Sequence, residues 1–113
     1  MSNLWTYREP AWADGRDIVG YDVEASDGSI GKIDQATAEA DSAHVVVDTG
    51  WWIFGKKRLI PAGAIAAVDH ENQTVSVQLT KDQIKDAPDF DAAVPLDRSN
   101  RSAYDDYYTP FGW

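Results

Sequence analysis

Short runs of aliphatic and β-branched residues, each followed by a glycine, aspartate or proline, constrain the fold of this chain more than any other feature. The dipeptide Asp27-Gly28 is typical of the tight turn of a β-hairpin. Val45–Val47 predicts a strand in the middle of a sheet, and Thr74–Leu79 alternates like a strand with one buried face. Five or six short strands at this spacing predict a mainly β fold, a small and strongly bent antiparallel sheet or barrel.

Further local signals refine this prediction. Isoleucines on both sides of Gly31 indicate a strand that is bent or bulged at the glycine. The segment Thr80–Gln83 fits the capping box, so one short helix is predicted from Lys81 to about Asp86, and Pro88 ends it. In the last strand, the side chains expected to face the core are Val75, Val77 and Leu79.

Composition limits the classes of partner. The chain has 113 residues, enough for one domain with one core. Its 19 acidic and 10 basic residues give a net charge of −9, which disfavours binding to nucleic acid. The one basic cluster, Lys56, Lys57 and Arg58, is interpreted as a solvated turn. No run of about 18 apolar residues predicts a membrane span, and without a signal-like start a cytoplasmic location is expected.

Few residues of this chain fit a known catalytic, metal-binding or phosphate-binding pattern. The chain has no cysteine, which excludes disulfides, thiolate nucleophiles and cysteine-ligated metals. His44 and His70 have no metal-binding spacing around them, and the serines lie in no nucleophile motif. No glycine-rich loop leads into a helix to bind phosphate. We therefore expect a protein that is not an enzyme, with no cofactor and no metal.

Several segments in register resemble PRC-barrel domains, from roughly Asp17 to Phe90. They are Asp17–Val23, Asp27–Ile33, Val45–Gly50, Phe54–Lys57, Arg58–Pro61 and Thr80–Pro88. The resemblance implies a small PRC-type β-barrel that binds proteins and catalyses no reaction, like the stand-alone actinobacterial members, some described as stress-related. The family also includes a ribosome maturation factor, so the alternative function is an RNA- or ribosome-associated factor acting through Lys56, Lys57 and Arg58.

The expected organisation follows from the resemblance and from the flanking composition. Residues 1–15 form an irregular N-terminal aromatic arm, residues 16–92 the PRC-barrel domain, and residues 93–113 a linker with an aromatic C-terminal tail. The polar stretch from Asp97 to Ala103 shows no periodicity and is assigned to the linker.

Aromatic residues are concentrated in the central hairpin and at both termini. Trp51 and Trp52 are adjacent, so they cannot both face inward on a regular strand. Exposed aromatics commonly anchor interfaces. The preferred interpretation is a homodimer or a complex with another protein, and the alternative is that the terminal aromatics cover the ends of their own barrel. The candidate interaction residues are Trp5, Trp12, Trp51, Trp52, Phe54, Tyr104, Tyr107, Tyr108, Phe111 and Trp113.

Overall fold

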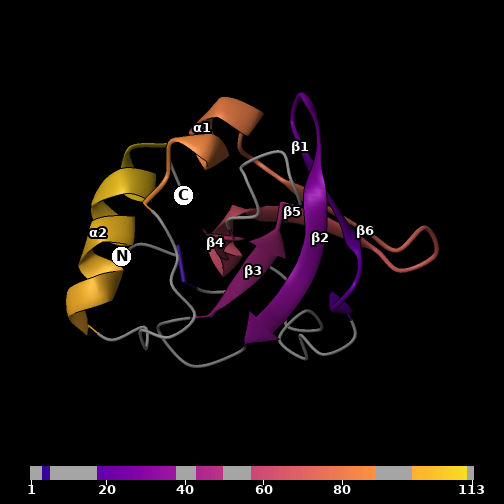
Figure 1. Cartoon of the computed structure of the whole chain (residues 1–113), viewed down its shortest axis with the longest axis horizontal. Helices are drawn as coiled ribbons and strands as arrows, with labels where there is room; N and C mark the ends of the chain where they lie inside the picture. The colour runs from indigo at the N-terminus through magenta and orange to yellow at the C-terminus, as the bar shows by residue number, and fades with distance from the viewer. Residues whose placement is uncertain (1–3, 6–17, 38–42, 50–56, 89–97, 112–113) are drawn as a thin grey trace.

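The computed structural model describes residues 4–5, 18–37, 43–49, 57–88 and 98–111, with side chains omitted for 98–100 (Figure 1). Within these residues the fold is a six-stranded sheet with the order β4-β3-β2-β1-β6-β5. The strands are β1 (Asp22–Ala25), β2 (Gly28–Thr37), β3 (His44–Asp48), β4 (Lys57–Pro61), β5 (Ile65–Asp69) and β6 (Thr74–Val77). The prediction of a small, mainly β fold with five to six short strands is confirmed.

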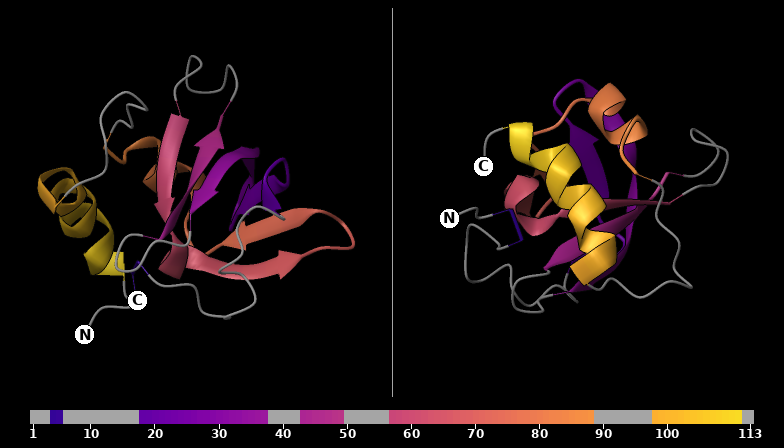
Figure 2. Two further views of the ribbon diagram at one scale, coloured as in Figure 1. Left: turned by 90° about the horizontal axis from the view of Figure 1, so that it is seen from below. Right: turned by 90° about the vertical axis from the view of Figure 1, so that its left-hand side faces the viewer.

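The sheet is strongly bent but not closed by hydrogen bonds. In the described part of the chain, β4 and β5 stand at its two ends, joined in sequence by the 3-10 turn Ala62–Ala64. Figure 2 shows β5 and β6 running across the direction of β3 and β4. The sheet therefore wraps around its core as two crossed parts that share β1 and β2.

The prediction of an entirely antiparallel sheet is wrong at one pair. The β1–β2, β2–β3, β3–β4 and β5–β6 pairs are antiparallel, but β1 and β6 run parallel, with Val23 opposite Val75. The chain crosses from β4 to the other end of the sheet, and the β5–β6 hairpin then returns beside β1. Turn residues predict the direction of strands that follow one another, but not of strands that meet after such a crossing.

The predicted bend at Gly31 is confirmed. The β1–β2 register shifts between Val23 and Glu24, so that β2 carries an extra residue beside Gly31. Gly31 has a φ of +150°, and a Cβ there would overlap the carbonyl oxygen of Asp48 and lie 2.9 Å from its carbonyl carbon. Only glycine combines this backbone angle with such a close approach of β2 to β3.

The core contains aliphatic side chains from every strand and from the first helix. Val75, Val77 and Leu79 are at most 3% exposed, as the alternation predicts. Helix α1 (Lys81–Lys85) begins with the predicted capping box. The Thr80 hydroxyl accepts from the Gln83 amide at 3.1 Å, and the Gln83 side chain accepts from the Thr80 amide at 2.8 Å. These two bonds satisfy amides that the first turn of a helix leaves unpaired.

The prediction of an irregular C-terminal tail is wrong for most of its length. Residues Arg98–Tyr108 form the helix α2, and Thr109–Phe111 continue it as a 3-10 turn, η4. The helix forms because Tyr104 and Tyr108, four residues apart, are both buried against the rest of the protein. No helix in the described ranges is long and apolar enough to cross a membrane.

Candidate interaction site

Helix α2 lies beside the sheet at its β4 end, and Figure 2 shows it as a separate layer next to the strands. Tyr104 is 5% exposed and Tyr108 is fully buried, whereas Ser102, Ala103 and Asp106 are exposed. This difference matches the helical repeat, because residues four apart share one face. One side of α2 is therefore a packing surface and the other faces outward.

Two tyrosine hydroxyls join α2 to the backbone of the sheet and of α1. The hydroxyl of Tyr108 donates to the carbonyl oxygen of Leu59 in β4 at 2.8 Å. The hydroxyl of Tyr107 donates to the carbonyl oxygen of Gln83 in α1 at 2.6 Å. The helix is thus held at two fixed main-chain positions that belong to different elements.

Burial extends to higher pH the range over which these hydroxyls stay protonated. It raises the pKa of Tyr108 far above the ordinary tyrosine value of 10.0. Burial also raises the pKa of Tyr107, with a further rise from the nearby Asp86 and an opposing effect from Arg58. Both groups therefore remain hydrogen-bond donors at an alkaline pH that would ionise a solvent-exposed tyrosine.

The N-terminal segment contacts α2 through Trp5. The indole N–H of Trp5 donates to the carboxylate of Asp105. The Trp5 ring also makes T-shaped contacts with the rings of Tyr104 and His44, with ring centres 6.5 and 6.3 Å apart. The guanidinium of Arg101 lies 6.0 Å from the centre of the Trp5 ring, and its Nε lies 3.6 Å from Asp105. Such cation–π and edge-to-face contacts are each favourable by about 0.5–1.5 kcal/mol.

Trp5 is itself fixed to the sheet by the main chain. The amide of Ala43 donates to the carbonyl oxygen of Trp5 at 3.2 Å, and the amide of Gly63 donates to that of Leu4 at 2.7 Å. Leu4 is fully buried and Trp5 is 8% exposed. The surface that receives α2, made of Trp5, Leu59 and Gln83, is termed the docking face.

Five of the aromatic candidates from the sequence lie at this location. Trp5, Tyr104, Tyr107 and Tyr108 belong to the contacts above, and Phe111 packs on Tyr107 and Tyr108 with ring centres 5.4 and 6.4 Å apart. These five residues contact other residues of the same chain. The remaining aromatic candidates, Trp12, Trp51, Trp52, Phe54 and Trp113, lie outside the described residues.

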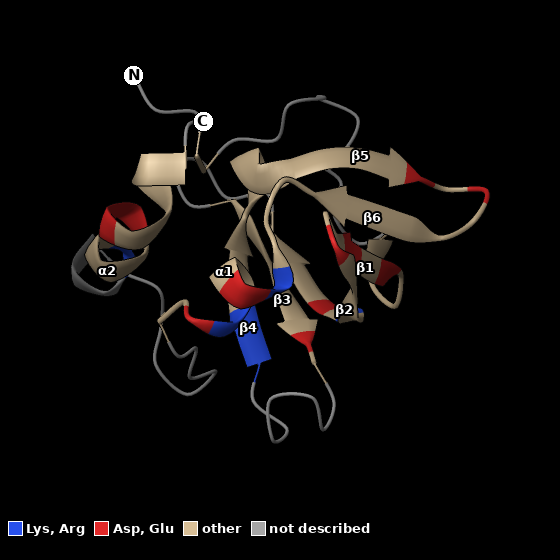
Figure 3. Cartoon of the chain, turned by 90° about the horizontal axis from the view of Figure 1, so that it is seen from above, with Lys and Arg blue, Asp and Glu red and all other residues tan. Residues whose placement is uncertain are grey.

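The basic cluster is not a uniformly solvated turn. Arg58 is only 4% exposed and donates to the carbonyl oxygen of Lys85 at 3.0 Å, near the end of α1. Lys57 pairs with Asp34 at 2.8 Å, and this hydrogen bond and charge raise the pKa of Lys57. Figure 3 shows this positive charge on β4, beside α1. Lys56 lies outside the described residues.

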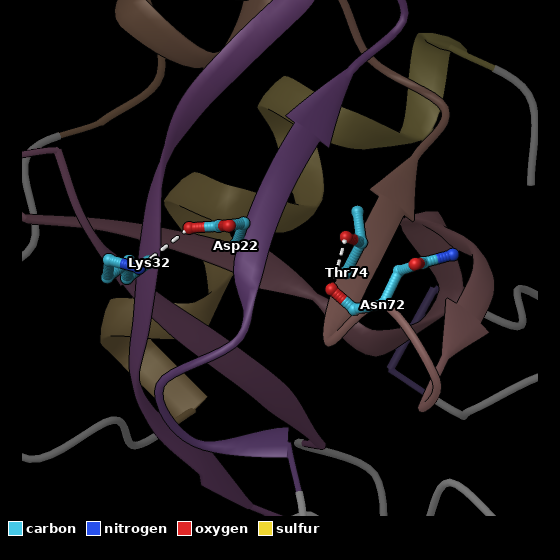
Figure 4. A network of polar contacts seen from close by, with 4 residues as sticks. All are labelled: Asp22, Lys32, Asn72 and Thr74. Carbon is cyan, nitrogen blue, oxygen red and sulfur yellow. Dashed lines mark hydrogen bonds and ion pairs between the residues drawn. The ribbon is translucent and has the colours of Figure 1, made fainter.

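Polar contacts on the central strands β1 and β2 and at the β5–β6 turn are exposed and local. Lys32 pairs with Asp22 across β1 and β2 at 2.8 Å, and the Thr74 hydroxyl donates to the carbonyl oxygen of Asn72 at 3.1 Å (Figure 4). Exposed ion pairs of this kind stabilise a fold by at most about 1 kcal/mol. In the described ranges, no three His, Asp or Glu side chains gather closely enough to hold a metal ion.

Sequence reasoning missed four residues of the site. Arg101 and Asp105 contact Trp5, while Leu59 and Gln83 supply carbonyl oxygens. The spacing of Arg101, Tyr104, Asp105 and Tyr108 was the available signal, because these positions share one helical face. Carbonyl acceptors leave no signal in a sequence, since every residue has one.

Comparisons with known proteins identify a fold and no family. No protein-family model matches the chain, and no curated protein matches it. Among solved structures, the chain is similar to RimM of Pseudomonas aeruginosa, described as a 16S ribosomal RNA processing protein. The TM-score is 0.50 at 18% identity, covering 66% of this chain and 48% of that one. The match thus spans about half of that protein, and the likeness supports a PRC-barrel-like fold.

Proposed function

We propose that this chain is a non-enzymatic protein-interaction module that associates with a second copy of itself or with another protein in the cytoplasm, in a stress-related role. The observation that carries the proposal is the docking of α2. The docking face holds an aromatic helix through the buried rings of Tyr104 and Tyr108 and through one main-chain carbonyl each from β4 and α1. A helix laid on an apolar surface is a recurrent mode of protein recognition.

The chemistry of the docking face supports this proposal. Tyrosine and tryptophan are enriched where proteins bind each other, because each combines a large apolar ring with one hydrogen-bonding group. Trp5, Tyr107 and Tyr108 all use both properties here, since their rings pack and their polar atoms donate. The same contacts can serve an interface between chains.

Sedimentation of the full chain over a range of micromolar concentrations tests the proposal. We expect the average mass to rise with concentration, and to rise less for Trp52→Asp, which places a charge in the aromatic segment 51–54. Gln35→Glu is the matched control, because it adds a negative charge at an exposed position of β2. A strictly monomeric unmodified chain, together with no protein captured from the native host by the full chain, would refute the proposal.

A second candidate is an RNA- or ribosome-associated factor, favoured by the likeness to a structure described as a ribosomal RNA processing protein. It would act through Lys56 and Lys57, because Arg58 is buried. Binding of a 16S ribosomal RNA fragment should then weaken steeply with added salt and be lost in Lys56→Ala/Lys57→Ala. Arg58 is left in place in this variant, since its removal would disturb packing as well as charge. Binding that is insensitive to salt dismisses this candidate.

A further inference from the structure

The attachment of α2 to the docking face runs through side chains at specific points. Tyr107 and Tyr108 reach main-chain oxygens, and Asp105 accepts from the indole of Trp5. Side-chain contacts of this kind can be broken and remade without rearranging the hydrogen-bonded ladders of the sheet. The helix is therefore attached through side chains, which include the two buried rings of Tyr104 and Tyr108.

The helix depends on this surface for its own stability. It has 11 residues, RSNRSAYDDYY, and isolated helices shorter than about 12–15 residues are marginal in water. Serine, asparagine, aspartate and tyrosine are all less favourable in helices than alanine. Detachment of α2 and loss of its helical structure should therefore occur together. The free energy of this local opening should be smaller than the free energy of global unfolding.

We infer that the docking face exchanges its own α2 for the α2 of a second copy, so that two chains associate by reciprocal exchange of this helix. This inference rests on the proposed function and names its partner. In the exchanged dimer the same tyrosines meet the same carbonyls, so few contacts are lost.

The chemistry of the docking face favours a second copy over an unrelated helix. The face requires tyrosines at the positions of Tyr107 and Tyr108, and an acid at the position of Asp105 that accepts the Trp5 N–H. Arg101 completes the set by lying near both the Trp5 ring and Asp105. A second copy of the chain carries all of these groups at the required spacing.

Net charge gives the exchange a definite salt dependence. Each copy carries a formal charge of −9, so two copies repel each other at low ionic strength. Salt screens this repulsion, with a Debye length of about 10 Å at 0.1 M. Dimerisation through α2 should therefore strengthen with added salt, which is opposite to the behaviour of RNA binding.

The test uses the full chain and a fluorescent synthetic peptide of residues 98–111 as the probe, with binding followed by anisotropy. Ala103→Gly weakens the chain's own α2 at an exposed position, so this variant should bind the peptide about fivefold more tightly than the unmodified chain. Ser102→Ala, at the neighbouring exposed position, strengthens the helix and should weaken peptide binding. These paired substitutions touch no residue of the docking face.

Two altered peptides examine specificity. A peptide with Tyr104→Ala and Tyr108→Ala should not bind, and one with Arg101→Ala and Asp105→Ala should bind at least tenfold more weakly. Equal binding of either altered peptide overturns the inference, as does a full chain that binds no peptide in any variant. If the chain self-associates in sedimentation but binds no peptide, α2 exchange is wrong and the proposed function stands.

Discussion

Substitution of Tyr108 by phenylalanine isolates one contact of the docking face. The ring is fully buried and stays so in phenylalanine, while the hydroxyl that donates to Leu59 at 2.8 Å is lost. A hydrogen bond of this kind contributes about 0.5–1.5 kcal/mol, and a buried acceptor that loses its donor costs about 1–3 kcal/mol. We therefore expect Tyr108→Phe to lower the free energy of unfolding by about 1–3 kcal/mol.

Urea denaturation followed by tryptophan fluorescence measures this change, and Tyr21→Phe is the matched control. The Tyr21 hydroxyl contacts His70 at 2.9 Å in an exposed position, where water can replace the bond, so its loss should cost less than about 0.5 kcal/mol. Tyr108→Ala should cost about 3–5 kcal/mol, because it also removes the buried ring. If Tyr108→Phe is as stable as the unmodified chain, the hydroxyl does not anchor α2 and the argument from this contact fails.

Three other predictions concern the backbone, the first helix and alkaline pH. Gly31→Ala should destabilise the fold by about 3 kcal/mol or more in urea denaturation, whereas Gly20→Ala, with nothing within 4 Å of its Cβ, should cost about 1–2 kcal/mol; equal losses would contradict the close approach of Asp48. Thr80→Ala should lower the free energy of unfolding by about 1 kcal/mol in the same assay, whereas Thr80→Ser should retain it; a Thr80→Ala variant as stable as the unmodified chain would contradict the role of the capping box. Above pH 10 the unfolded chain loses the Tyr108 proton while the folded chain keeps it, so stability should fall with pH, and less steeply in Tyr108→Phe; identical pH profiles would contradict this assignment.

The parts of the fold that the sequence predicted are those encoded by neighbouring residues. The β1–β2 hairpin, whose turn residues are Ser26 and Asp27, the bulge at Gly31 and the capping box of Thr80 each depend on a few adjacent positions with a definite backbone requirement. The parallel pairing of Val23 with Val75 joins strands distant in sequence, and nothing local specifies its direction.

The docking face was only partly predictable for a similar reason. Aromatic content pointed to Trp5 and Tyr108, but the helix that carries Tyr108 has weak intrinsic helix propensity and forms through tertiary contacts. Arg58 was assigned to a solvated turn because of its two lysine neighbours, yet it lies on β4 where every residue from 58 to 61 is buried, and it is only 4% exposed. Burial of a charged residue on an edge strand depends on what covers that strand, which here includes α1.

The most direct test of the account is isotope-filtered NMR on an equilibrated mixture of labelled and unlabelled full-length chains. The account predicts cross-peaks between the α2 tyrosine rings of one chain and the β4 side chains of another, and these peaks should grow with protein concentration and with salt. The absence of these cross-peaks between chains at every protein concentration and salt concentration would contradict the exchange of α2.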